Sequence, residues 1–154
     1  MKETFEALTS LQLTFDALVF PRHLPNLFEL LERHPDLSVV VDHGAKPRIE
    51  IDEFEPWASD IRHIASTTSA YCKLSGLVTE AGPGWSEDAL RPYVEHLIEC
   101  FGAQRLMWGS DWPVVNRVAS YDRWRECTKS LLDELTADEQ SAIFGGTAAE
   151  FYGI

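Results

Sequence analysis

Residues 105–114, which read RLMWGSDWPV, decide the predicted fold of this chain. A short apolar run, Leu106 to Trp108, ends in Gly-Ser-Asp-Trp-Pro. Because Pro113 has no amide hydrogen to give to a sheet ladder, the strand must stop before it. In α/β proteins with parallel strands, ligands and catalytic groups gather where the strands end. We therefore expect Asp111 to lie where a catalytic base or a metal ligand would be placed.

Three further apolar segments precede this strand and alternate with helical patterns. We predict strands over residues 13–20, 38–41, 71–77 and 106–109. Apolar positions at helical spacing predict helices over residues 24–33, 57–65, 90–101 and 121–135. Residues 79–88, TEAGPGWSED, are expected to form a long glycine-rich loop, and Thr136 with Glu139 a capping box. The repeat of about 30 residues is typical of a βαβ unit.

This alternation predicts an α/β fold of parallel strands with outer helices, equal to half of a (β/α)8 barrel. A complete barrel takes about 250 residues, whereas this chain has 154. The competing prediction is a small open parallel sheet with helices on both faces, and the strand repeats fit either architecture. No linker or low-complexity segment divides the chain, so a single domain is expected over residues 1–154.

The composition argues against several classes of partner. The formal net charge is −12, and no basic cluster offers a footprint for nucleic acid. An acidic surface disfavours binding to anionic membranes. The chain contains no run of about 18 apolar residues, so no transmembrane helix is expected. The three cysteines are scattered, which predicts reduced thiols. With no signal-peptide core at the N-terminus, we expect a cytoplasmic protein.

Asp111 and His43 are the main candidates for chemistry. Asp111 could act as a general base toward water, alone or bound to a metal, or could be a turn residue that accepts hydrogen bonds from backbone amides. His43 follows an apolar strand and precedes Gly44. It could bind a divalent metal, donate a hydrogen bond to a substrate carbonyl oxygen, or be an ordinary loop histidine. One histidine and one aspartate fall short of the three protein ligands of a catalytic zinc.

Further candidates for substrate binding lie after the predicted strands, in loops or, for Ser75, on the third predicted strand. They are Arg22, His23, Lys46, Ser75, Trp85 and Trp112. The basic residues could receive an anionic or polyhydroxylated ligand, or could be solvated loop charges. Trp85 could form a lid over a sugar-like ligand or anchor its own loop. Ser75 could line the site or face a neighbouring strand.

Four segments together resemble the amidohydrolase-related family of TIM-barrel hydrolases. They are VVDHGAKP at 40–47, CKLSGLVTE at 72–80, WGSDWP at 108–113 and FGGTA at 144–148. Within that family the chain is similar to the branch of sugar-acid lactonases of the L-fuconolactonase and L-rhamnonolactonase type. The likeness spans nearly the whole chain and depends on the combination, because any one segment alone is weak.

The resemblance implies that the four strands are the fifth to eighth of the barrel. It implies a general-base role for Asp111, and a role for His43 in polarising the scissile carbonyl group. The implied reaction is hydrolysis of a sugar-acid lactone or a related cyclic ester, with a small molecule as the substrate. The implied cofactor is one divalent metal such as zinc, with His43 and Asp111 among its ligands, or none.

The chain also departs from the family, whose members begin with a first strand that carries a His-x-His or His-x-Asp pair. No such pair occurs here, so the sequence looks like a C-terminal half whose activity alone is an open question. One expectation is a lactonase-like hydrolase that works once the barrel is completed. Another is a non-catalytic half-barrel that associates with itself or completes a partner through its open edges. A third is a ligand-binding module with Trp85, Trp108 and Trp112 as an aromatic platform.

Overall fold

A computed structural model describes residues 2–154 and contains one four-stranded sheet. The strands are β1 (Phe15–Ala17), β2 (Val39–Val41), β3 (Tyr71–Leu74) and β4 (Leu106–Trp108). All neighbours pair in parallel, in the order β1-β2-β3-β4. Ala17 lies opposite Val41, and Leu74 lies opposite Trp108, so the carboxyl ends of the strands lie together at one end of the sheet. The predicted α/β fold with parallel strands is confirmed.

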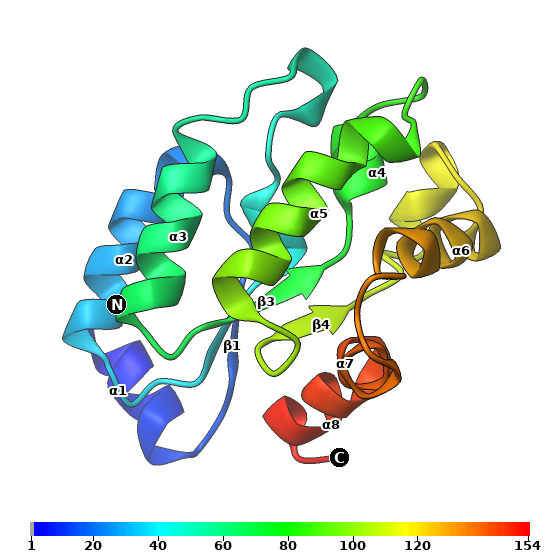
Figure 1. The fold of residues 1–154 in the computed structure, drawn as a ribbon. Helices are drawn as coiled ribbons and strands as arrows, with labels where there is room; N and C mark the ends of the chain where they lie inside the picture. Colours follow the sequence, from blue (N-terminus) through cyan, green and yellow to red (C-terminus); the bar gives the residue numbers. More distant parts are fainter. Residues whose placement is uncertain (1) are drawn as a thin grey trace.

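Helices connect the strands and cover the sheet (Figure 1). They are α1 (Lys2–Ser10), α2 (Leu24–Arg33), α3 (Trp57–Thr67), α4 (Leu77–Glu80), α5 (Glu87–Phe101), α6 (Tyr121–Leu131), α7 (Ala137–Ser141) and α8 (Thr147–Tyr152). In Figure 1, α3 and α5 lie in front of the sheet, and α8 lies below β4. Short 3-10 turns over Pro21–His23, Asp42–Ala45, Ile49–Ile51 and Val114–Arg117 follow the strands or lie between helices.

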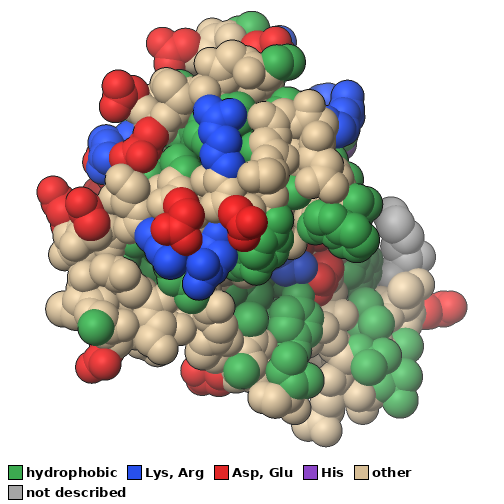
Figure 2. All heavy atoms as spheres, turned by 90° about the vertical axis from the view of Figure 1, so that its right-hand side faces the viewer, with side chains coloured by type: hydrophobic (Ala, Val, Ile, Leu, Met, Phe, Trp, Pro, Cys, Tyr) green, Lys and Arg blue, Asp and Glu red, His purple; other side chains and the backbone are tan. Residues whose placement is uncertain are grey.

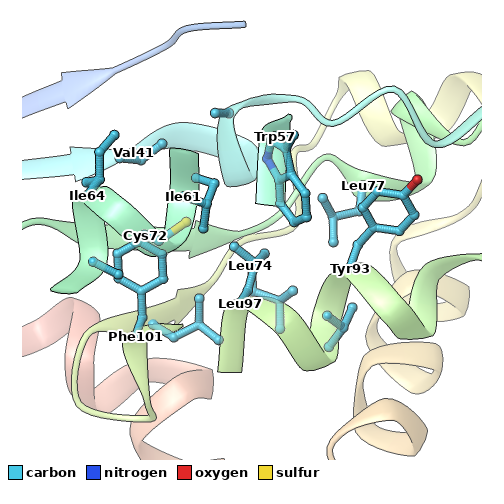
Figure 3. Close-up of a cluster of buried hydrophobic side chains, with 14 of the residues drawn as sticks. Val41, Trp57, Ile61, Ile64, Cys72, Leu74, Leu77, Tyr93, Leu97 and Phe101 are labelled. Atoms are coloured by element: carbon cyan, nitrogen blue, oxygen red, sulfur yellow. The ribbon is translucent and has the colours of Figure 1, made fainter. Parts of the chain in front are cut away.

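The main core lies between the sheet and the helices α3 and α5 (Figure 3). Cys72 and Leu74 of β3, Ile61 of α3 and Leu97 of α5 are completely buried there. Successive side chains of a strand point to opposite faces of a sheet. Burial of Cys72 and Leu74 against the helices therefore places Lys73 on the other face.

Lys73 is held on that face by two carboxylates. Its Nζ lies 2.6 Å from Oδ2 of Asp16 on β1 and 2.7 Å from Oδ1 of Asp42 after β2. The hydroxyl of Tyr152 on α8 donates to the same Asp16 oxygen at 2.8 Å. Burial lowers the pKa of Lys73, but its hydrogen bonds with Asp16, Asp42 and Tyr152 outweigh this effect and raise the pKa. Lys73 therefore stays charged and links three strands to the last helix.

Two predicted strands are too long. The segment 13–20 forms a strand only over Phe15–Ala17, where it pairs with β2, and then enters the turn Pro21–His23. The segment 71–77 ends as a strand at Leu74. Gly76 has a φ of 68°, and Leu77–Glu80 forms the helix α4 within what was predicted as strand and loop. Short apolar runs do not separate strand from buried helix, which accounts for this error.

Helix boundaries agree more closely with the prediction. Helix α2 spans the expected residues 24–33, whereas α6 ends at Leu131, four residues before the predicted end. Helix α5 begins at Glu87 and not at residue 90, because the Ser86 side chain caps it by accepting from the amide of Ala89. The capping box is confirmed, since Glu139 donates its amide to Thr136 Oγ1 and accepts the amide of Thr136.

The three thiols are free, as expected from their scatter in the sequence. Burial raises the pKa of Cys72, and it raises the pKa of Cys127 to about 11. A protonated thiol is a poor nucleophile, so neither residue is a candidate for covalent chemistry at neutral pH. Within residues 2–154, every helix is too short or too polar to cross a bilayer.

Arg105, directly before β4, bonds to the segment that connects α3 to β3. Its guanidinium donates to the carbonyls of Ala65, Thr68 and Ala70 at 2.9, 3.2 and 3.2 Å. These carbonyls lie at the end of α3 and at the start of β3.

We expect Arg105→Met to lower the free energy of unfolding by about 1.5–3 kcal/mol, because it removes charged hydrogen bonds to partly buried carbonyls. Urea denaturation of the purified chain measures this loss. Arg125→Met is the matched control, since the Arg125 side chain is 43% exposed and bonds to the neighbouring Glu126, and its effect should stay within about 0.5 kcal/mol. Equal losses in the two variants would contradict the assigned role of Arg105.

Candidate functional site

His43 lies in a turn with unusual backbone conformation directly after β2. The φ angles of His43, Gly44, Ala45 and Lys46 are 54°, 55°, 61° and 55°. Left-handed conformations are costly for residues other than glycine and persist only where the surroundings enforce them. Here Trp57 of α3 enforces the turn, because its indole N–H donates to the Gly44 carbonyl at 2.6 Å. The turn directs the imidazole toward the ends of β3 and β4.

The His43 ring packs against Ser75 and Gly76, the two residues that follow β3. Its Nδ1 lies 2.7 Å from Oγ of Ser75, a side chain that is 2% exposed. The ring also lies directly against Gly76, where an added Cβ would come within 2.8 Å of the His43 Cγ. Only glycine at position 76 leaves room for this approach.

Asp111 approaches the other ring nitrogen from the end of β4. It adopts a φ of 56°, and its backbone carbonyl accepts from the amide of Val115 at 2.9 Å. Its Oδ1 lies 3.6 Å from His43 Nε2, a distance that allows electrostatic attraction but is long for a hydrogen bond. Its Oδ2 faces the Thr79 hydroxyl at 3.5 Å. The structure thus brings together His43, Ser75 and Asp111, and it adds Thr79.

The electrostatic surroundings keep His43 neutral at neutral pH. Burial lowers its pKa below the ordinary value of 6.5, and the nearby ammonium groups of Lys46 and Lys73 lower it further. The carboxylates of Asp111 and Asp42 raise the pKa but do not offset burial. A neutral imidazole carries one N–H donor and one acceptor nitrogen.

The basic residues proposed for substrate binding have different partners. Lys46 pairs with Glu80, with Nζ 2.9 Å from Oε1. The Arg22 guanidinium lies over the Phe20 ring, 4.8 Å from its centroid. His23 accepts the amide of Phe20 at Nδ1, at 3.2 Å. Arg22 is exposed at the surface, whereas the charge of Lys46 is already compensated.

The tryptophans divide into packing residues and one exposed residue. Trp85 is buried, donates to the Val118 carbonyl at 3.2 Å and lies beneath the Arg123 guanidinium. This placement is that of a loop anchor, the alternative to a lid. Trp108 donates to Thr128 at 3.1 Å. Trp112 is 66% exposed, so the three rings do not offer a shared platform.

Thr79, Gly76 and Lys73 were not among the candidates from sequence. Thr79 falls in the segment predicted as a loop, and only helix α4 turns its hydroxyl toward Asp111. The signal that could have drawn attention to Lys73 is its position in the middle of an apolar strand. A lysine within an apolar strand indicates a polar partner, but the sequence does not show which residue supplies it.

The residues of this chain do not by themselves fit a catalytic metal. Residues 2–154 contain no group of three or more His, Cys, Asp or Glu side chains arranged to hold an ion. His43 and Asp111 supply two donors, and Nδ1 of His43 is already bonded to Ser75. A catalytic zinc takes three protein ligands.

A hollow of about 900 Å³ lies elsewhere, between α1 and the end of α2. Phe5, Leu30, Arg33 and His34 are among its lining residues, and none of the predicted site residues lines it. The hollow adjoins Pro35 and Asp36, which precede β2, and so lies away from the carboxyl ends of the strands, where ligands of parallel α/β folds gather. The strand ends with His43 and Asp111 are therefore the better candidate.

Comparisons with known proteins identify the family of this chain. The family model described as amidohydrolase matches residues 2–154. The L-fucono-1,5-lactonase of Burkholderia ambifaria is 40% identical over 158 residues, which cover 100% of this chain and 54% of that protein. The L-fucono-1,5-lactonase of Burkholderia multivorans is 39% identical, over 91% of this chain and 51% of its own length.

A solved structure is also closely similar. It is an amidohydrolase from Burkholderia multivorans with bound zinc, with a TM-score of 0.90 and 36% identity. The match covers 96% of this chain and 55% of that chain. The chain thus spans about half the length of the curated relatives it matches. This coverage confirms the predicted half-barrel, and the match over nearly every residue shows that the chain belongs to the amidohydrolase family.

Proposed function

We propose that this chain carries the hydrolytic site of an enzyme that opens a sugar-acid lactone or a similar cyclic ester. The observation that carries the proposal is the carboxylate of Asp111 beside a neutral His43 at the carboxyl ends of the strands. The names of the relatives that are 40% and 39% identical, both L-fucono-1,5-lactonases, support the substrate class.

In the proposed mechanism, Asp111 acts as general base toward a water molecule. The water oxygen attacks the lactone carbonyl carbon, and its proton passes to Asp111. His43 donates a hydrogen bond to the carbonyl oxygen, where negative charge develops in the tetrahedral intermediate. The bond from the carbonyl carbon to the ring oxygen then breaks. The leaving oxygen takes the proton back from Asp111, which yields an open-chain hydroxy acid.

Arg22 and Trp112 are the proposed contacts for the sugar hydroxyls, because both are exposed near the ends of β1 and β4. Lys46 acts in the proposal as part of its pair with Glu80, and His23 holds the turn that presents Arg22. Trp85 takes no part because it is buried. At the candidate site residues 2–154 bring together two potential metal donors, His43 and Asp111, so no step of the mechanism is assigned to a metal.

Association is the second candidate, and the two sheet edges favour it. Within residues 2–154, β1 and β4 each pair on one side only. Exposed strand edges promote pairing with other chains. Figure 2 shows hydrophobic side chains gathered in the lower right part of one face, around a recess with charged side chains. Leu11, Leu13, Leu18 and Phe20 are exposed on either side of β1.

We expect Asp111→Asn to lower the rate of aldonolactone hydrolysis by a factor of about 10²–10⁴, the usual contribution of a general base. Proton release from a panel of aldonolactones measures the rate. Asp133→Asn, an exposed aspartate after α6, is the matched control and should retain the full rate. The thermal melt of Asp111→Asn should match that of the wild type. A loss of about 1–3 kcal/mol in stability without a change in rate would make Asp111 structural.

The titration of His43 gives an independent test of the electrostatics. We expect its pKa to lie below 6.5, and the Asp111→Asn variant to lower it further, because Asp111 raises it in the wild type. The unfolded chain binds the proton more readily than the folded one, so stability should fall as the pH drops below about 6.5. NMR titration of the five histidines, with His43→Asn for assignment, measures the shift. A rise of the pKa in Asp111→Asn would refute this account.

We also expect the purified chain to associate as its concentration rises, through the edges of β1 and β4. Analytical ultracentrifugation over a wide concentration range measures the sedimentation coefficient. Lysine substitutions at Leu13 and Leu18, which flank β1, should favour the monomer because charged edges resist pairing. A sharp monomer at every concentration would rule out the association proposed for the wild-type chain.

A further inference from the structure

We infer that Ser75 is a positioning residue that fixes the tautomer of His43, with its ring hydrogen on Nε2. His43 then faces the reaction site as a hydrogen-bond donor. This inference deepens the proposed hydrolytic function, but it concerns the resting state of the ring and can be tested without turnover.

The first argument comes from the hydroxyl hydrogen of Ser75. Ser75 is 2% exposed, and within residues 2–154 the one polar partner of its Oγ is His43 Nδ1, at 2.7 Å. A buried hydroxyl that donates to nothing costs about 1–3 kcal/mol. The hydroxyl therefore donates to Nδ1, which must be the unprotonated nitrogen. Because a neutral imidazole has one N–H, the hydrogen lies on Nε2.

The second argument comes from Asp111 and does not involve Ser75. Nε2 lies 3.6 Å from Oδ1 of Asp111. An N–H directed toward a carboxylate is attracted to it, whereas a nitrogen lone pair in the same place is repelled. The Thr79 hydroxyl faces the second oxygen of Asp111 at 3.5 Å. Both oxygens therefore face a donor when the hydrogen is on Nε2.

The packing around the ring also favours this arrangement. Gly76 lies against the face of the ring, and an added Cβ there would be 2.9 Å from Nδ1. Gly109 lies against Ser75, where an added Cβ would be 3.0 Å from the Ser75 Cβ. A ring turned by 180° would place a C–H group opposite the Ser75 hydroxyl and would break its one hydrogen bond. Gly76 and Gly109 thus leave the space in which Ser75 and His43 remain in contact.

The tautomer decides what His43 can do. With hydrogen on Nε2, the ring can donate to a carbonyl oxygen in the space near Asp111. To bind a metal through Nε2, the hydrogen would have to move to Nδ1, and the Ser75 hydroxyl would lose its acceptor. Ser75 therefore acts through His43 and favours a donor role over a ligand role.

The test is the protonation state of each His43 ring nitrogen, read by NMR on the full 154-residue chain labelled with nitrogen-15 in histidine. Long-range proton–nitrogen correlations at a pH above the ordinary histidine range separate protonated from unprotonated ring nitrogens. His43→Asn identifies the signals of His43. We expect Nε2 in the protonated range and Nδ1 in the unprotonated range, and the reverse assignment overturns the inference.

The role of Ser75 is tested with Ser75→Ala. Without the hydroxyl donor, Nδ1 of His43 should move toward the protonated range as the second tautomer becomes populated. Ser66→Ala on α3 is the matched control, because its hydroxyl donates to the His63 carbonyl on the helix surface, and it should leave His43 unchanged. If Ser75→Ala keeps the wild-type signals, Ser75 does not set the tautomer. A chain with the expected tautomer but no lactone hydrolysis would overturn only the proposed function.

Discussion

Lys73 places its ammonium group between the carboxylates of Asp16 and Asp42, at 2.6 and 2.7 Å, on the sheet face opposite the core. The Lys73 side chain is 21% exposed, and its two ion pairs hold β1, β3 and the residue after β2 in their relative positions. Asp42 directly precedes His43. The same ion pair therefore anchors the end of β2 and the strained turn that presents the imidazole.

The candidate site depends on this anchoring because its parts come from different strands. His43 follows β2, Ser75 follows β3 and Asp111 follows β4, and the parallel register brings the three together. Two of them, His43 and Asp111, have left-handed backbone conformations. The stability lost at these positions is offset by buried contacts, such as the hydrogen bond from Trp57 to the Gly44 carbonyl.

Much of this arrangement could be predicted from the sequence, because it depends on local signals. The run before Pro113 located β4 and Asp111, and the apolar residues before Asp42 located β2 and His43. Contacts between distant segments could not be predicted. Thr79 reaches Asp111 only because Gly76 starts a helix where an apolar run resembled a strand. Trp85 lies in a glycine-rich loop, yet it is buried and donates a hydrogen bond to the Val118 carbonyl 33 positions away. Lys73 had partners 57 and 31 positions away, which no pattern within a single element could identify.

The hydroxyl of Tyr152 closes a contact with Asp16 across 136 positions of the chain. The strands themselves pair in sequence order, so the sheet can grow as the polypeptide leaves the ribosome. Helix α8 differs, since its bond to β1 cannot form until the segment that carries Tyr152 has been synthesised. The Asp16 carboxylate of β1 therefore gains its second partner, the Tyr152 hydroxyl, only after β2, β3 and β4 have been synthesised. Contacts of such separation slow folding, because loop closure must precede the gain in energy. Closure of the sheet face that carries Lys73 is therefore expected to be slower than the pairing of neighbouring strands.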